Sequence, residues 1–286
     1  MKRSLWIAGA AVVLMGMSGW ARPVWTDPVE PGENSVQWKL SDGKTLRVDV
    51  LAENLFRIRR SWTDGWTESG LNRYGVLKRD WPAAAFTRDG DSLKTAAAEL
   101  AFDAKAETLR LRSLVSAADL TIAATAAGAG SEVRFSLKPG ERVYGLGDVS
   151  RDNIQRRGKR YEMWVKNLLS YIPIPMAMTS EGWGFLLNTT WHHFIDVGAK
   201  DKDTLGCEIP EGDADFYVFT GKGYREMLDV YTQLSGRPAL LPAFGFGFTF
   251  VCNQFIDQFN LVRDAYEFRR TGIPCDTLGL EPGWME

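Results

Sequence analysis

Short runs in which apolar and polar residues alternate recur through the middle of the chain, and they constrain its fold most. A period of two places every second side chain on the same face of an extended strand. The apolar members of these runs are Val36-Trp38-Leu40, Leu46-Val48-Val50, Phe56-Ile58, Leu109-Leu111, Leu120-Ile122 and Val133-Phe135-Leu137. Glycines fall between the runs as turn signals. Many short strands without intervening helices predict an antiparallel β-sandwich.

The period changes from two to helical near residue 224. An apolar stripe with helical spacing is formed by Tyr224, Met227, Leu228, Tyr231 and Leu234. Gly236 ends this helix, and the prolines that follow prevent its continuation. We therefore place a domain boundary here, with a β-sandwich domain over residues 22–235 and a second domain over residues 236–286.

The last fifty residues read as strand, helix and strand. Residues 243–251 are apolar almost throughout, which is typical of a strand buried on both faces of a parallel sheet. A helix capped by Asn253 follows and ends at Gly272, and residues 277–280 form a second strand that finishes at Glu281. This order predicts the opening βαβ of a (β/α)8 barrel. Because a complete barrel takes about 250 residues, we expect this barrel to be truncated.

The amino terminus has the three parts of a secretory signal peptide. Lys2 and Arg3 precede an apolar run over residues 5–17, and the small residues Gly19 and Ala21 provide a cleavage site. The run is shorter than the roughly 20 residues that span a bilayer. We expect residues 1–21 to be removed and the protein to be exported to the periplasm or the exterior, with no membrane attachment afterwards.

Several kinds of site are disfavoured by composition and motif. A net charge of -2 without a long basic run argues against nucleic acid as a partner. The only two histidines, His192 and His193, are adjacent, so on a strand they point to opposite faces and cannot chelate one metal together. No phosphate-binding loop or Gly-x-Ser-x-Gly elbow is present. We predict neither cofactor nor metal. The basic stretch at 156–160 reads as a solvated loop, with substrate or partner contact as the alternative.

The order of several motifs resembles glycoside hydrolase family 31, which contains α-glucosidases and α-xylosidases. The motifs are Tyr144-Gly-Leu-Gly-Asp148, the patch from Trp164 to Asn167, Ile172-Pro-Ile-Pro175, Gly184-Phe-Leu-Leu-Asn188, and Ile273-Pro-Cys-Asp276 leading into the strand that ends at Glu281. The resemblance implies a galactose-mutarotase-like β-sandwich followed by a (β/α)8 barrel. It also implies retaining hydrolysis of α-glycosides by two aspartates on later barrel strands, beyond Glu286. No catalytic residue is therefore assigned in this chain.

The resemblance does imply substrate-binding residues. The second barrel strand of the family typically ends in Asp-Ile-Asp-Tyr, whose first aspartate binds sugar hydroxyls, and this chain has Glu281-Pro-Gly-Trp284 instead. Glu281 and Trp284 are thus expected in the cleavage subsite. The longer acid leaves α-glucoside, α-galactoside and N-acetylgalactosaminide substrates open. The family's sandwich also sends a loop over the active site, for which residues 156–169 are the candidate, with Trp164 and Asn167 contacting the leaving sugar.

Two functions remain after these steps. The first is the amino-terminal fragment of a secreted retaining α-glycoside hydrolase with a carbohydrate substrate, inactive by itself. The alternative is an exported β-sandwich that binds carbohydrate without cleaving it. The strand-helix-strand segment at 243–286 favours the hydrolase, because a binding module has no use for it. The sequence does not set an oligomeric state.

Overall fold

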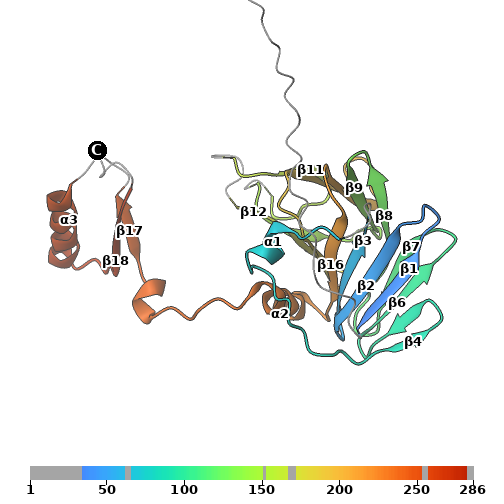
Figure 1. Cartoon of the computed structure of the whole chain (residues 1–286). Helices are drawn as coiled ribbons and strands as arrows, with labels where there is room; N and C mark the ends of the chain where they lie inside the picture. Colours follow the sequence, from blue (N-terminus) through green and yellow to red (C-terminus); the bar gives the residue numbers. More distant parts are fainter. Residues whose placement is uncertain (1–33, 62–65, 151–152, 167–171, 253–256, 282–286) are drawn as a thin grey trace, which may run out of the picture. The chain divides into compact units, whose positions relative to one another are not determined.

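Two antiparallel β-sheets make up most of the chain in the computed structural model, which describes residues 34–61, 66–150, 153–166, 172–252 and 257–281 (Figure 1). The chain divides into two compact units, Met1–Ser235 and Gly236–Glu286, and each is described by itself. The segment predicted as a signal peptide, residues 1–21, lies outside the described residues.

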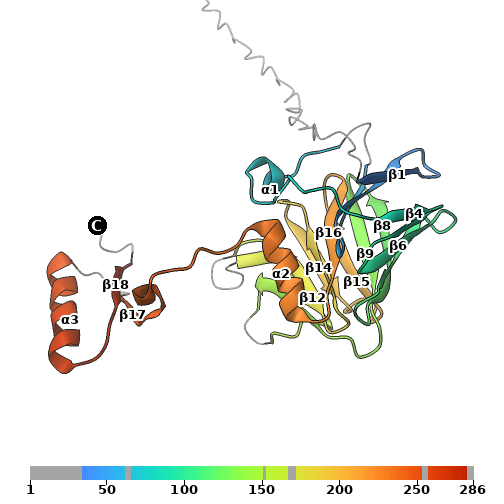
Figure 2. The same ribbon diagram turned by 90° about the horizontal axis from the view of Figure 1, so that it is seen from below.

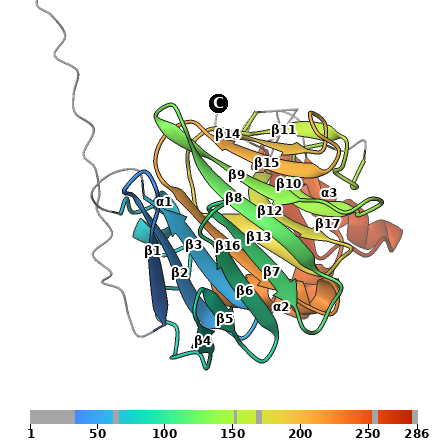
Figure 3. The same cartoon turned by 90° about the vertical axis from the view of Figure 1, so that its right-hand side faces the viewer.

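The first unit is a sandwich of a seven-stranded and a nine-stranded sheet. Across the first sheet the order is β1 (Ser35–Lys39), β2 (Thr45–Ala52), β3 (Leu55–Arg60), β16 (Ala214–Thr220), β13 (Trp183–Leu187), β12 (Ile172–Thr179) and β10 (Val143–Asp148). Across the second it is β11 (Lys159–Met163), β14 (His193–Val197), β15 (Thr204–Ile209), β9 (Gly130–Ser136), β8 (Asp119–Ala127), β7 (Thr108–Ser113), β6 (Ala98–Asp103), β5 (Ser92–Lys94) and β4 (Thr87–Asp89) (Figure 3). The antiparallel sandwich predicted from the period of two is confirmed.

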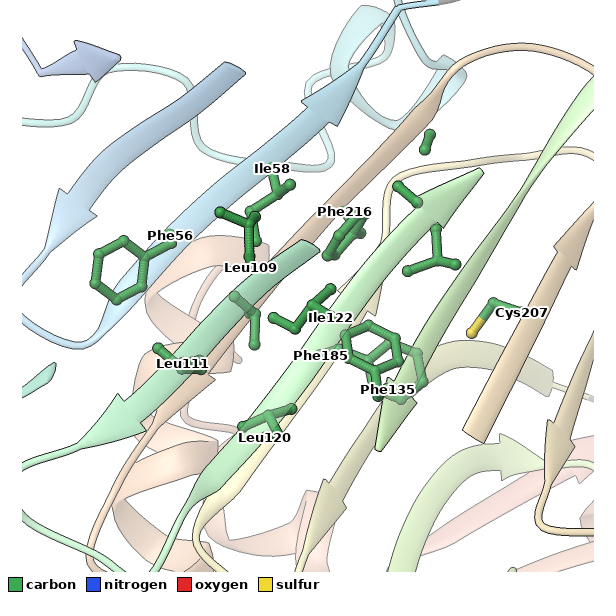
Figure 4. Packing of buried hydrophobic residues seen from close by; sticks show 14 of the residues in the cluster. Phe56, Ile58, Leu109, Leu111, Leu120, Ile122, Phe135, Phe185, Cys207 and Phe216 are labelled. Atoms are coloured by element: carbon green, nitrogen blue, oxygen red, sulfur yellow. The ribbon is translucent and has the colours of Figure 1, made fainter. Parts of the chain in front are cut away.

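The core lies between the two sheets, where each strand contributes its alternate apolar side chains. In β7, Leu109 and Leu111 are buried while Arg110 and Arg112 face outward, as the sequence pattern predicts. Phe135 lies near the middle of the core, and its ring stacks on Phe185 with centroids 4.9 Å apart (Figure 4). This single continuous core fixes the register of both sheets, because a slip by one residue would expose it.

A second apolar layer covers the outer face of the seven-stranded sheet (Figure 2). The helix α2 (Tyr224–Ser235) buries Met227, Val230 and Leu234 there, against residues of β12, β13 and β16. A short helix, α1 (Gly70–Arg73), begins at Ser69, whose side chain accepts a hydrogen bond from the Asn72 amide. The predicted helix at 224–234 is confirmed, but Tyr224 and Leu228 of its predicted stripe are exposed and Val230 is buried instead. The helix α1 was not predicted because one turn has no detectable period.

The central strand β3 departs from the simple pattern. Its alternation would ordinarily place Arg57 and Arg59 on a solvent face, opposite Phe56 and Ile58, but both are buried, and so is Arg60 on the other face. Arg57 forms two hydrogen bonds with Asp215 of β16, at 2.9 and 2.6 Å. The Arg59 guanidinium lies 4.8 Å from the centroid of the Trp66 ring. Buried charges are tolerated here because they are paired across neighbouring strands.

The second unit contains a short 3₁₀ helix η1 (Ala243–Phe246), β17 (Thr249–Cys252), α3 (Gln258–Thr271) and β18 (Thr277–Leu280). The prediction of one strand over 243–251 is wrong in extent, since Ala243–Phe246 forms the 3₁₀ turn and only the last residues are extended. The predicted burial is also wrong, because no side chain of the described part of this unit is buried. The helix cap is Asp257 rather than Asn253, and the predicted end at Gly272 is confirmed.

Candidate functional site

Glu281 directly follows β18, at the carboxyl end of a parallel strand pair. Strand β17 runs parallel to β18 with Thr249 opposite Thr277 and Cys252 opposite Leu280, and α3 connects the two strands. The Glu281 side chain is partly exposed. In open α/β sheets, ligands bind outside the carboxyl ends of the strands. Glu281 therefore lies at the edge of the strand pair at which α/β units bind ligands.

The local sequence explains how this strand pair forms. Asp257 caps α3 by accepting a hydrogen bond from the Asn260 amide at 2.9 Å, and Gly272 ends the helix with a φ of 68°. Asp276 then packs so closely on Gly247 that a Cβ at that position would lie 2.0 Å from the carboxylate. The Asp276 amide also donates to the Phe248 carbonyl at 2.9 Å. These contacts fix the start of β18, four residues before Glu281.

Trp164 lies just beyond β11, at an edge of the nine-stranded sheet, and its side chain is 49% exposed. Its ring centroid is 5.3 Å from that of His192, with the ring planes tilted by 46°. An indole that is half exposed and supported on one side can offer its other face to a ligand. The contact of Trp164 with the leaving sugar stays a prediction.

Glu162 organises the surroundings of Trp164. Its carboxylate accepts a hydrogen bond from Lys166, and its Oε1 lies 2.8 Å from Nε2 of His192. The hydrogen bond from Lys166 lowers the pKa of the Glu162 carboxyl, and His192 contributes in the same direction. Glu162 is consequently ionised at neutral pH and binds Lys166, which follows β11, and His192, which precedes β14.

The two histidines have opposite environments, as their adjacency predicts. His192 is exposed, whereas His193 is buried in β14 with Nδ1 2.6 Å from the Trp191 carbonyl. Burial lowers the pKa of the His193 imidazole. A structural role for His193 follows from this burial, while His192 belongs to the surroundings of Trp164.

The four predicted substrate-binding residues divide between the two units. Trp164 is in the first unit and Glu281 in the second, so the position of each is described only within its own unit. Asn167 and Trp284 lie outside the described residues. Sequence reasoning missed Glu162 and His192 as neighbours of Trp164. The available signal was the two-residue spacing of Glu162 and Trp164 at the end of β11.

The basic stretch at 156–160 is not a simple solvated loop, which corrects that prediction. Arg156 is buried, and its guanidinium donates to four backbone carbonyls, those of Gly145, Gly147, Ser150 and Asn153. These carbonyls lie in or just after the Tyr144-Gly-Leu-Gly-Asp148 motif, whose residues 145–147 all have positive φ. Arg156 therefore holds an unusual backbone in place by satisfying it from the inside.

In the described ranges, no group of three or more histidine, cysteine, aspartate or glutamate side chains is arranged to hold a metal ion. None of the helices in those same ranges is both long and apolar enough to cross a membrane.

Comparison with known proteins decides the family. The model of the glycosyl hydrolase 31 N-terminal galactose mutarotase-like domain matches residues 45–196. The chain belongs to glycoside hydrolase family 31. This family 31 match covers the strands from β2 to β14, including the Trp164 surroundings and the Arg156 loop. The family predicted from the motifs is thereby confirmed.

Relatives of this family 31 chain include an α-glucosidase from Saccharolobus solfataricus, 28% identical over 54% of this chain and 24% of the relative. An α-xylosidase from Emericella nidulans is 27% identical over 53% of this chain and 20% of the relative. Among solved structures, a Flavobacterium johnsoniae dextranase of family 31, complexed with glucose, has a TM-score of 0.76 at 20% identity and covers 91% of this chain and 34% of that one. The chain spans about a quarter or less of the length of these two curated relatives.

Proposed function

We propose that this chain is the amino-terminal part of an exported retaining α-glycoside hydrolase. The observation that carries the proposal is the match of the family's amino-terminal domain to residues 45–196. The much greater length of the curated relatives supports the view that the catalytic aspartates lie on barrel strands after residue 286. The amino-terminal charge and apolar run of residues 1–21 support export after signal cleavage.

The proposed reaction proceeds in two displacements. A carboxylate attacks the anomeric carbon while a carboxylic acid protonates the leaving glycosidic oxygen, and the resulting glycosyl-enzyme is hydrolysed by water that the second residue deprotonates. The two carboxyl groups of retaining enzymes lie roughly 5 Å apart. Within residues 1–286 we assign no residue to either role, so this chain alone should bind sugar without cleaving it.

We assign substrate binding to residues of both units. Glu281 would accept hydrogen bonds from sugar hydroxyls in the cleavage subsite, with Trp284 beside it. Trp164 and Asn167 would contact the leaving sugar. The support for Glu281 is its place at the carboxyl end of β18, and the support for Trp164 is its half-exposed ring. The choice between α-glucoside, α-xyloside and α-galactoside substrates depends on how the longer acid places its oxygens.

We also propose that β17, α3 and β18 are the first βαβ of a (β/α)8 barrel. The parallel register of the two strands and the helical crossover support this. So does the uncovered apolar face of α3, where Phe259, Val262 and Tyr266 are exposed by 74%, 67% and 67%. The neighbouring strand-helix units of a barrel would cover such a face.

Expression of the reading frame with its continuation beyond residue 286 tests the proposal. The extended protein should hydrolyse at least one of a panel of aryl α-glucosides, α-xylosides and α-galactosides with retention of configuration, and residues 1–286 alone should not. Turnover by residues 1–286 clearly above background would contradict the proposal, as would an extended protein that cleaves none of the panel. Amino-terminal sequencing of the exported protein should begin after Ala21.

A further inference from the structure

A row of three rings lies at the β11 edge of the nine-stranded sheet. The His192 centroid is 5.3 Å from that of Trp164 and 5.2 Å from that of Phe194, and both pairs of planes are tilted by less than 50°. We call Trp164, His192 and Phe194 the ring strip. Strands β11 and β14 pair so that Glu162 lies opposite Phe194, and Figure 3 shows these strands beside β15.

The alternation of β14 exposes the strip instead of burying it. His192 and Phe194 are two residues apart and share the outer face, while His193 between them points into the core. Trp164 and His192 are exposed and Phe194 is partly exposed. Ring surface is therefore accessible along the strip.

Carboxylates held by cations flank the strip. Glu162 lies between Lys166 and His192 at one end. Glu208 of β15 accepts a hydrogen bond from Arg160 at 2.6 Å and another from Lys200. The Arg160 guanidinium also lies 3.7 Å from the Phe194 centroid, close enough for a cation–π contact.

This arrangement differs from the remainder of the same outer face. Across β6, β7, β8 and β9 that face carries ion pairs that neutralise one another, between Arg112 and Glu99, Arg110 and Asp119, and Arg134 and Glu132. At the strip, exposed rings are added to such pairs. The strip therefore combines apolar ring faces with a few fixed polar groups, which is the composition of small-molecule sites.

The chemistry of the strip selects a neutral, hydroxyl-rich ligand. The C–H faces of pyranose rings pack on aromatic rings, carboxylate oxygens accept hydroxyl hydrogen bonds, and ammonium or guanidinium groups donate to hydroxyl oxygens. Arg160, Lys166 and Lys200 against Glu162 and Glu208 leave a single positive charge when the imidazole is neutral. Each of these cations is already paired with a carboxylate, and these carboxylates would repel an anionic ligand.

We propose that the ring strip binds a neutral oligosaccharide, extending sugar contact from Trp164 along β14. The inference rests on the proposed function for the position of Trp164 beside the leaving sugar. Because the rings are tilted and lie at the surface of a sheet, we expect shallow binding with a Kd on the order of 1 mM, which corresponds to a binding free energy of about 4 kcal/mol.

Titration of the full chain with maltotriose and isomaltotriose, by calorimetry and saturation-transfer NMR, tests the proposal. Trp164→Ala and Phe194→Ala should each weaken binding about tenfold. The matched control is Tyr74→Ala, which removes a ring that is 75% exposed but lies outside the strip, and it should leave Kd unchanged within about twofold. Trigalacturonic acid should bind more weakly than either neutral sugar. Thermal melts verify that each variant is folded.

Two outcomes would overturn the proposal. One is the absence of saturable binding by the full chain, and the other is equal binding by both ring-strip variants and Tyr74→Ala. The proposed function can be judged separately from the strip. If the extended protein hydrolyses α-glycosides but the chain does not bind sugar, the proposed function stands and the ring strip proposal fails. Binding at the strip without hydrolysis by the extended protein leaves the non-catalytic carbohydrate-binding function.

Discussion

The helices α2 and α3 carry similar apolar stripes but bury them to different extents. In α2, Met227, Val230 and Leu234 are buried against the seven-stranded sheet. In α3, Phe259 and Val262 stay exposed, although Phe268 of the same helix contacts rings of β17 and the residue before it. An apolar stripe thus shows which face of a helix has to be buried. Whether that face is buried depends on another element packing against it, as the seven-stranded sheet packs against α2. The following predictions test this difference between the units.

Removal of matched phenylalanines should give the largest contrast. Phe135→Ala removes a ring that contacts Phe185, Trp183 and Phe216 in the core, so the free energy of unfolding of the sandwich should fall by about 3–5 kcal/mol. Phe259→Ala removes an exposed ring of the second unit and should change the free energy of unfolding of that unit by no more than about 0.5 kcal/mol. Urea titration followed by circular dichroism measures both. Equal losses would mean that the second unit is as tightly packed as the first.

Glu281→Gln should give the next largest effect, on activity of the extended protein. If Glu281 binds a sugar hydroxyl as a carboxylate, loss of the charged hydrogen bond should lower kcat/KM by about 30- to 150-fold. Glu267→Gln is the matched control in the same unit, because Glu267 forms an exposed pair with Arg270. Steady-state kinetics with an aryl α-glycoside distinguishes the two. An unchanged kcat/KM for Glu281→Gln would remove the assigned role.

Arg156→Lys should destabilise the sandwich although it retains the charge. A lysine ammonium cannot reach the four carbonyls that the guanidinium satisfies, so the free energy of unfolding should fall by about 2 kcal/mol. Arg134→Lys replaces an arginine of an exposed pair with Glu132, where a loss below about 0.5 kcal/mol is expected. Equal unfolding midpoints for the two variants would show that the loop is held by other contacts.

His193 should produce the smallest effect, a dependence of stability on pH. Burial lowers its folded-state pKa below the ordinary value of 6.5, so the unfolded chain binds a proton first as the pH falls. Stability should therefore be full above pH 6.5 and decline below it, by at most about 1.4 kcal/mol per pH unit. His193→Asn retains a donor for the Trp191 carbonyl and should flatten this slope between pH 6.5 and 5. Identical slopes in both proteins would contradict the assignment.

Alternation predicted the sandwich because its strands bury one face in a common core, as in β7. It failed to predict the burial of Arg57 and Arg59, because the strand that covers them, and Asp215 as the partner of Arg57, come from distant parts of the chain. The same limit applies to the site. The place of Glu281 followed from a local strand-helix-strand pattern, whereas the contact of His192 with Trp164 depends on the pairing of β14 with β11.

The segment 243–251 shows a different limit. Its apolar composition predicted a long buried strand, yet Pro242 begins a 3₁₀ turn, and Gly247 is held by the close packing of Asp276. Composition reports what a segment must eventually bury, while proline and glycine decide where it can extend. Asn253 and Asp257 are both good cap residues, and the sequence alone did not distinguish between them.

The pairing of β3 with β16 determines when the sandwich can fold during synthesis. Arg57 and Asp215 are 158 residues apart, yet their strands are neighbours near the centre of the seven-stranded sheet. At about 5–20 residues per second, a ribosome needs roughly 10–30 s to deliver β16 after β3. During that interval Arg57 lacks its acidic partner Asp215, and β3 lacks the strand that joins it to β13. The nascent chain therefore remains open for most of its translation, and a chaperone would meet it before it folds.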